Sequence, residues 1–338
     1  MEAVTDVVFR HVVARSGAPD LFFTEFANAT GWVHAGDKAI AGRLIKTDDE
    51  HPIVAQIWGG EPGDMEAFAK HCAELGFDGI DINMGCPAKS AVKSGGSALI
   101  RQPEVAIAAI AAAKTASLPV SVKTRLGYSS VDEWHDWLTA LLQQNIAALT
   151  IHLRTKKEMS KVPAHHELIS GVVKLRDEIA PSTLLIINGD IRDREHGMEL
   201  VNEYGVDGIM IGRGVFQNPF CFRDTPKRAT RGGAAPTETK SIDFVEDGAD
   251  RVAGPADSDL RSEAYDGSGK NRKALVELLN YHLDLFDEWQ PALGRPYETL
   301  KRFFKVYIRD FDGASDLRAA LMMTHTTDEA RELLKTID

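Results

Sequence analysis

One cysteine stands where it can do chemistry. Cys86 follows a short apolar run at 80–82 and lies between Gly85 and Pro87, two residue types that end strands. Cations and a glycine pair follow on the same loop, at Lys89, Lys93, Gly95 and Gly96. An ordinary thiol has a pKa of about 8.5 and is mostly protonated near neutrality, so it can act as a general acid. Free cysteines are more often buried and inert, but this loop context favours a functional thiol.

Polar side chains also follow the other apolar runs, at the points where strands would end. They are Gln56, Asn83, Lys123, His152, Asn188-Gly189-Asp190 and Gly212-Arg213. In a βα barrel these ends meet on one rim, which is where barrel enzymes carry their sites. Any one of these residues is better explained by structure, since a buried amide usually satisfies backbone groups. Six strand ends of this kind together indicate a site.

The same rim residues suit a phosphorylated cofactor with a polar ring. Asn188-Gly189-Asp190 and Gly212-Arg213 follow the last two strands, where barrels commonly bind phosphate, because glycines let backbone N–H groups approach an anion. Arg213 can pair with a phosphate bidentately. Lys123 can counter negative charge developing on a ring, and Gln56 and His152 can hydrogen-bond its heteroatoms. The ordered set resembles the FMN sites of flavin-dependent barrel oxidoreductases.

Short apolar runs alternate with helical stretches along the first two thirds of the chain. Strands are predicted at 21–23, 53–57, 79–82, 120–123, 149–152, 184–188 and 208–211, and helices at 6–16, 64–75, 103–115, 131–143, 165–178 and 193–204. This alternation predicts a parallel sheet, buried on both faces. The fold class is therefore α/β, a (β/α)8 TIM barrel whose first strand is missing. We expect the native chain to extend upstream of Met1 by one strand, about 5–10 residues.

Composition divides the chain into three segments. Residues 1–222 are the predicted cofactor-binding barrel and catalytic domain. Residues 223–272 are rich in small and polar residues without periodicity, which predicts a disordered insertion. Residues 273–338 return to helical spacing, with helices expected over about 275–289, 297–309 and 328–337. This last segment is predicted to be a small helical domain.

Bulk composition is that of a water-soluble globular protein. The chain has 338 residues, 43% of them hydrophobic, and no segment has the roughly 20 apolar residues of a membrane span. Three cysteines without a Cys-x-x-Cys pair fit a reducing cytoplasm and speak against a disulfide framework or a zinc site. We therefore expect no metal and no membrane association. The net charge of −11 by itself argues against nucleic-acid binding, so any RNA site needs local clustering of cations.

Several motifs resemble one family closely, the tRNA-dihydrouridine synthases. They are Met1-Glu-Ala-Val-Thr-Asp, Asn83-Met-Gly-Cys-Pro, Lys93-Ser-Gly-Gly-Ser-Ala-Leu-Ile, Val122-Lys-Thr-Arg-Leu-Gly, Asn188-Gly-Asp-Ile and Met210-Ile-Gly-Arg-Gly. The resemblance covers residues 1 to about 222 and, more loosely, 297–309. Asn-x-Gly-Cys-Pro is the specific motif, because the others occur more widely in flavin barrels. This chain departs from the family pattern at the absent first strand and at Leu153, where many relatives have glycine.

The resemblance implies an FMN enzyme that uses NADPH to reduce uridines in tRNA to 5,6-dihydrouridine. Hydride would reach C6 of the uracil, and Cys86 would protonate C5. The implied cofactor-binding residues are Met1, Gln56, Lys123, His152, Asn188, Gly189, Asp190, Gly212 and Arg213. The implied substrate- and RNA-binding residues are Asn83, Lys89, Lys93, Arg154, Lys301, Arg302 and Lys305.

Cations gather where an RNA partner would need them. Lys89 and Lys93 lie on the loop after Cys86, and three more lysines lie at 156, 157 and 161. A third group of cations, Lys301, Arg302, Lys305 and Arg309, is spaced to lie largely on one helix face. A solvated helix face explains the last group equally well, and the family resemblance favours tRNA. We expect a monomer. Two alternatives stay open: an FMN barrel oxidoreductase acting on a small molecule of the dihydroorotate or enone type, and a flavin-free RNA-binding or scaffold barrel.

Overall fold

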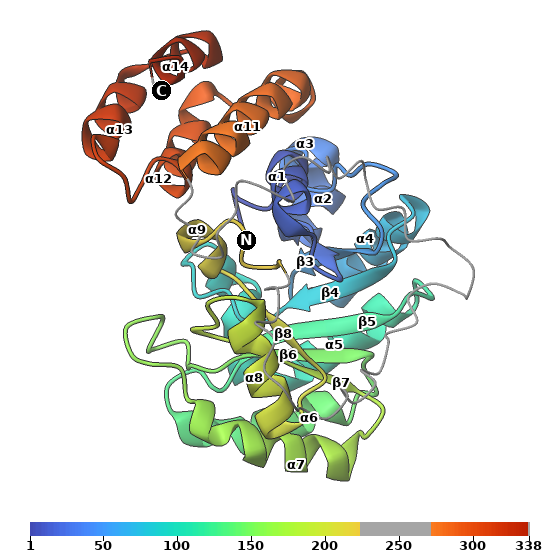
Figure 1. The fold of residues 1–338 in the computed structure, drawn as a ribbon. Coiled ribbons are helices and arrows are strands. Elements are labelled where there is room, and N and C mark those ends of the chain that lie inside the picture. Colours follow the sequence, from blue (N-terminus) through green and yellow to red (C-terminus); the bar gives the residue numbers. More distant parts are fainter. Residues whose placement is uncertain (224–271, 337–338) are drawn as a thin grey trace.

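The computed structural model describes residues 1–223 and 272–336, so the predicted insertion at 223–272 lies almost wholly outside the described residues. Figure 1 shows a curled sheet surrounded by helices, with a cluster of C-terminal helices on one side. The strands are β1 (Phe22–Phe23), β2 (Ala27–Asn28), β3 (Ile53–Trp58), β4 (Gly79–Asn83), β5 (Val120–Arg125), β6 (Ala148–His152), β7 (Leu184–Asn188) and β8 (Gly208–Met210). All strand pairs are parallel, in the order β1-β3-β4-β5-β6-β7-β8.

The predicted barrel-type fold is confirmed. Each of the seven predicted runs forms a strand, and successive strands pair in chain order, as in a (β/α)8 barrel. Within the described residues β8 and β1 are the two ends of the sheet and do not pair with each other. The two-residue strand β2 was not predicted. It pairs with the same strand as β1, at Ala27 opposite Ile57, and is too short to carry a periodic signal.

Helices cover the outside of the sheet. They are α1 (Val7–Gly17), α2 (Ala29–Ala35), α3 (Asp37–Ile40), α4 (Pro62–Glu74), α5 (Pro103–Lys114), α6 (Trp134–Leu142), α7 (Ile169–Ile179), α8 (Arg194–Tyr204) and α9 (Gly214–Gln217). Short 3-10 turns precede several of them: η1 (Ala91–Lys93), η2 (Gly96–Arg101), η3 (Val131–Glu133) and η4 (His166–Leu168). The Asp6 side chain caps α1 by accepting the N–H of Phe9 at 2.9 Å. The barrel core is the apolar set between these helices and the strands.

The C-terminal helices share a second core with the start of the chain. They are α11 (Arg272–Leu293), η5 (Tyr297–Phe303), α12 (Phe304–Tyr307), α13 (Ala314–Met323) and α14 (Thr327–Leu334). Their apolar side chains pack with those of α1 and with Val215 and Phe220 after β8. The arginine Arg295 extends this contact with ion pairs to Asp6 and Glu25. The C-terminal helices are therefore anchored on the barrel by both apolar and charged contacts.

The helix predicted at 297–309 forms over 297–307, but not as one regular α-helix. The segment is a 3-10 helix, η5, followed directly by a single α-helical turn, α12. Phe303, Phe304, Val306 and Tyr307 are all buried, so the segment is packed on several sides, while Lys301, Arg302 and Lys305 face one groove. Helix α13 was missed; it begins after Gly313, whose φ of 80° suits glycine at a turn.

Candidate active site

The loop that carries Cys86, residues 84–95 between β4 and η2, is called the thiol loop. It turns directly after the carboxyl end of β4. Asn83, the last residue of β4, accepts the backbone N–H groups of Gly85 at 3.1 Å and Cys86 at 3.0 Å through Oδ1. Gly85 lies against the backbone of Thr124, where an added Cβ would come within 3.3 Å. Only glycine fits this close approach easily. The Asn83 side chain and the Gly85 contact together fix where Cys86 stands.

Cys86 is half-buried and remains protonated near neutrality. Burial raises the pKa of its thiol, and the Arg125 charge lowers it in part. The other free cysteines, Cys72 and Cys221, are fully buried, and burial raises the pKa of each to about 12. Cys86 is thus the one thiol of the described residues that is both accessible and available as an acid.

Two basic side chains lie close together on the neighbouring strands β5 and β6. Desolvation and the charge of Arg125 lower the pKa of Lys123 to about 7, while Asp81 acts in the opposite direction. Desolvation and the charges of Lys123, Arg125 and two further arginines lower the pKa of His152 to about 2, so its imidazole is neutral. The rim therefore concentrates positive charge, which suits an anionic ligand.

The two glycine segments after β7 and β8 stand side by side. The Asn188 side chain donates to the Met210 carbonyl at 2.7 Å and so ties the end of β7 to β8. Gly189 has a φ of 126°, and a Cβ there would meet Ala164 at 3.1 Å and His152 at 3.3 Å. At Gly212 a Cβ would meet only the Asn188 amide, at 3.9 Å. Gly189 is buried, whereas the partly exposed Gly212 leaves its backbone open beside the cationic rim, as phosphate binding requires.

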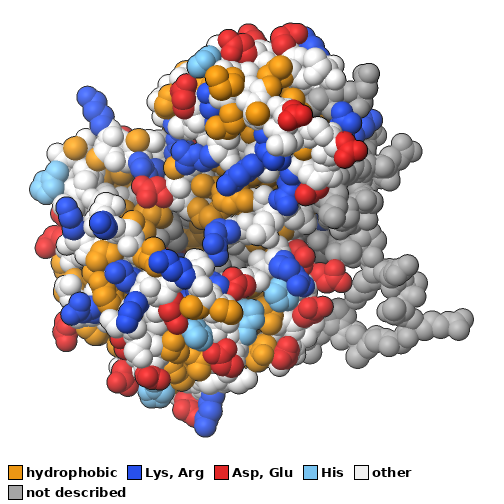
Figure 2. All heavy atoms as spheres, turned by 90° about the vertical axis from the view of Figure 1, so that its left-hand side faces the viewer, with side chains coloured by type: hydrophobic (Ala, Val, Ile, Leu, Met, Phe, Trp, Pro, Cys, Tyr) orange, Lys and Arg blue, Asp and Glu red, His pale blue; other side chains and the backbone are white. Residues whose placement is uncertain are grey.

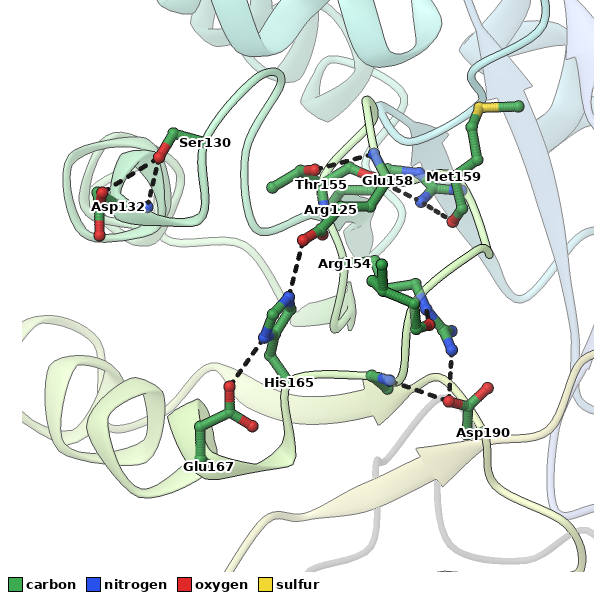
Figure 3. A network of polar contacts seen from close by, with 12 residues as sticks. Arg125, Ser130, Asp132, Arg154, Thr155, Glu158, Met159, His165, Glu167 and Asp190 are labelled. Atoms are coloured by element: carbon green, nitrogen blue, oxygen red, sulfur yellow. Dashed lines mark hydrogen bonds and ion pairs between the residues drawn. The ribbon is translucent and has the colours of Figure 1, made fainter.

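Asp190 and Arg154 form an ion pair next to these glycine segments (Figure 3). The Asp190 carboxylate also accepts the N–H of Ala164 at 2.9 Å, and the hydrogen bond from Arg154 lowers its pKa. Arg154 further donates to the Val162 carbonyl at 2.6 Å and contacts His152 Nε2 at 3.3 Å. Both predicted residues lie at the site, but in the structure their side chains bind each other and the β6–α7 loop.

Arg125 is a site residue that the sequence analysis left without a role. Its guanidinium donates to the carbonyls of Gly85 at 2.7 Å, Thr155 at 3.1 Å and Met159 at 2.9 Å. Figure 3 shows it reaching into the β6–α7 loop, residues 153–168, which carries the lysines at 156, 157 and 161. Arg125 therefore joins the thiol loop to the lysine-bearing loop. Its position within Val122-Lys-Thr-Arg was the only available signal.

Other side chains at the site are engaged with protein groups. Gln56 is buried, donating through Nε2 to Asp81 at 2.7 Å and accepting from Asn83 Nδ2 at 3.2 Å. At the chain start, the Met1 ammonium donates to Thr5 Oγ1 at 2.6 Å. Burial raises the pKa of the Cys86 thiol and the charge of that ammonium lowers it in part, so Met1 lies near the thiol.

The charge pattern fits the phosphate and ring of FMN. Within residues 1–223 and 272–336 the side chains of Lys123 and of the exposed Arg213 make no hydrogen bond or ion pair, and both lie near other cations at the rim. Desolvation makes the Lys123 charge costly unless negative charge balances it, and Asp81 supplies part of that balance. Together with Arg213 and the open backbone at Gly212, Lys123 forms a site that an anionic cofactor would complete.

The predicted RNA-binding cations lie on two surfaces. Lys89 and Lys93 are exposed on the thiol loop. Lys301, Arg302 and Lys305 line a groove of about 400 Å³ in the C-terminal helices together with Phe304, Arg318 and Met322. Lys301 donates to the Met322 carbonyl at 3.0 Å and Arg302 to the Ala3 carbonyl at 2.9 Å, so two of the three are partly tethered. Figure 2 shows Lys and Arg side chains gathered around the hollow on this side of the molecule.

Residues 1–223 and 272–336 contain neither a candidate metal site nor a candidate membrane helix. No group of three or more His, Cys, Asp or Glu side chains there is placed to hold a metal ion. Likewise, none of the helices in that part has the length and apolar character needed to cross a membrane.

Comparison with known proteins identifies the family. The sequence model described as "Dihydrouridine synthase (Dus)" matches residues 1–255. A "Probable tRNA-dihydrouridine synthase 2" of Bacillus subtilis is 51% identical over 336 residues, covering 99% of this chain and 91% of that protein. A "Probable tRNA-dihydrouridine synthase" of Staphylococcus epidermidis is 48% identical over 340 residues, covering 100% of this chain and 92% of the relative. Because the family model matches more than half of the chain and both relatives match nearly all of it, the chain belongs to the dihydrouridine synthase family.

Proposed function

We propose that this protein reduces specific uridines of tRNA to 5,6-dihydrouridine, using NADPH and a bound FMN, as a cytoplasmic monomer. The observation that carries the proposal is the half-buried, protonated Cys86 thiol beside a cationic rim on the same strand ends. The names of the relatives support tRNA as the substrate. Bound FMN would supply the hydride that NADPH delivers to it, and that hydride would add to C6 of uracil.

The protein's own groups account for the rest of the reaction. Cys86 would give its proton to C5, so that one hydride and one proton saturate the C5–C6 double bond. Protonated Lys123 would oppose the negative charge of the reduced ring, and neutral His152 would hydrogen-bond to it. Arg213, with the backbone at Gly189 and Gly212, would bind the phosphate.

The uridine must leave the RNA stack to reach this site. Cations lie on the thiol loop, on the β6–α7 loop and in the groove of the C-terminal helices, and they would hold the RNA backbone while the base enters. Lys89, Lys93, Lys301, Arg302 and Lys305 would do so by phosphate contacts. Asn83 would act by orienting the thiol loop, since its amide oxygen accepts two of that loop's N–H groups.

The test is the variant Cys86→Ala. We expect it to abolish dihydrouridine formation in tRNA, measured by mass spectrometry, while NADPH oxidation by the flavin continues. Cys221→Ala is the matched control, because that thiol is buried away from the rim. Wild-type dihydrouridine formation in Cys86→Ala would remove Cys86 as the acid.

The alternative is an FMN barrel oxidoreductase for a small molecule. The basic groove in the C-terminal helices disfavours it, because a small substrate needs no such surface. Oxidation of a free dihydroorotate-type compound, or reduction of a free enone, at rates above those on tRNA would support it. A purified protein without a visible flavin band would instead favour the flavin-free RNA-binding barrel.

A further inference from the structure

A fully buried carboxylate lies beneath the thiol loop. Asp81 is in the middle of β4 and has no exposed surface. Its Oδ2 accepts Gln56 Nε2 at 2.7 Å, and its Oδ1 accepts Ser121 Oγ at 2.6 Å. In the sheet Gln56 stands opposite Asp81 and Asp81 opposite Ser121, so the three side chains meet across β3, β4 and β5. Neither the sequence motifs nor the proposed reaction gives Asp81 a role.

The hydrogen bonds run from Asp81 to the thiol in one direction. Burial raises the pKa of Asp81, and the hydrogen bonds from Ser121 and Gln56 and the charge of Lys123 lower it. Both carboxyl oxygens of Asp81 accept a hydrogen bond, one from Ser121 Oγ and one from Gln56 Nε2, so Gln56 turns its NH2 group toward Asp81. Its Oε1 then faces Asn83 and accepts Nδ2 at 3.2 Å. With its NH2 group used in this way, Asn83 has its Oδ1 left to accept the N–H groups of Gly85 and Cys86. At the far end the backbone N–H groups can only donate, so both ends demand the same orientation.

We propose that Asp81 is a positioning residue for Cys86: its carboxylate fixes the orientation of the Gln56 and Asn83 amides and thereby the conformation of the thiol loop. The inference rests on the proposed role of Cys86 as proton donor. Without an acceptor at position 81, Gln56 can turn its amide by half a turn and present NH2 to Asn83. Asn83 would then turn its oxygen toward Gln56 and withdraw it from the thiol loop, which would lose two hydrogen bonds.

Asp81 also lies near Lys123, whose pKa its charge raises. A role as counter-ion and a role in orientation are separated by two variants. Asp81→Asn loses the charge but keeps an oxygen for Gln56, because Ser121 Oγ can accept from the new NH2 group. Asp81→Leu keeps the branched shape with larger methyl groups and loses both the charge and the hydrogen-bond acceptor. Ser121→Ala is the matched control, since it removes a hydrogen bond to the same carboxylate but leaves the direction of the Gln56–Asn83 chain intact.

The experiment measures two quantities on the full-length protein. The first is the rate of iodoacetamide alkylation at Cys86, followed by peptide mass spectrometry, with the buried Cys72 and Cys221 reporting any global opening. The second is dihydrouridine formation in tRNA relative to flavin reduction by NADPH. For Asp81→Leu we expect alkylation of Cys86 about tenfold faster and dihydrouridine formation about tenfold slower, as for loss of a buried hydrogen bond. Asp81→Asn and Ser121→Ala should stay within about threefold of wild type in the alkylation assay.

Two results would overturn the proposal. One is a folded Asp81→Leu whose Cys86 reacts at the wild-type rate. The other is an Asp81→Asn that loosens the thiol as much as Asp81→Leu, because charge and not orientation would then matter. If Asp81→Leu does not fold, Gln56→Met breaks the same chain with little volume change, and a wild-type alkylation rate there overturns the proposal equally. Absence of dihydrouridine formation by the wild-type protein would refute the proposed function alone, since the alkylation assay does not depend on it.

Discussion

Removing the guanidinium of Arg125 should loosen two loops at once. Arg125 is 8% exposed and donates to three backbone carbonyls, two of them in the β6–α7 loop and one in the thiol loop. Hydrogen bonds from a charged donor contribute about 1.5–3 kcal/mol each. Against this, burial lowers the pKa of Arg125 to about 10, a shift that corresponds to an unfavourable contribution of about 3 kcal/mol. Arg125→Met should therefore lower the free energy of unfolding by about 2–6 kcal/mol.

Urea unfolding followed by tryptophan fluorescence measures this loss. Trp137 is a suitable reporter, because its indole N–H donates to Thr124 Oγ1 at 3.0 Å, one residue before Arg125. Lys174→Met is the control: Lys174 is 77% exposed and its pairing distance to Glu178 is 3.9 Å, so we expect a change below about 0.5 kcal/mol. An Arg125→Met variant within about 1 kcal/mol of wild type would refute the stabilising role assigned to the three carbonyl contacts.

Three further predictions follow from the charged groups. The lowered pKa of Lys123, about 7, leaves it charged only below that pH, so flavin reduction by NADPH should slow as pH rises through 7; a flat profile, or the same profile in Lys123→Met, contradicts this. Burial lowers the pKa of His165, but its hydrogen bonds to Glu158 and Glu167 raise the pKa by more than burial lowers it. The charged imidazole therefore stabilises the β6–α7 loop fully below the ordinary pKa of histidine, and this stabilisation is lost as pH rises through the raised pKa. Proteolysis of that loop should quicken over this range in wild type and not in His165→Gln. Finally, Glu50→Leu leaves the buried Arg10 charge unpaired and should cost about 3–5 kcal/mol in urea unfolding, with the double variant Arg10→Met/Glu50→Leu recovering part; equal losses in single and double variants would count against the pair.

The strands and their order were predictable because buried parallel strands have a strong local signature. The run 184–188, for example, is apolar up to its last residue, the polar Asn188. The 3-10 turn at Tyr297–Phe303 was not predictable in this way. Its charges have helical spacing, but Phe303 and Phe304 are both buried, and packing on both sides overrides the local preference.

The placement of the rim residues was predictable to the level of the strand end. Because parallel strands share one carboxyl edge, Cys86, Lys123 and Arg213 were expected to lie together. In the structure Arg125 is close enough to interact electrostatically with each of the three. Their partners were not predictable. Arg154 and Asp190 were expected to face ligands, and in the structure they bind each other.

The sequence by itself determined the βα order, the cysteine at the end of β4 and the family, since each depends on residue type and spacing along the chain. Only the tertiary structure decided that Asp81, Gln56 and Asn83 form one directed chain of hydrogen bonds toward Cys86. The physical reason is that hydrogen-bond direction depends on which donors and acceptors meet across neighbouring strands. Gln56 and Asp81 are 25 residues apart in the chain, and strand register alone brings them opposite each other.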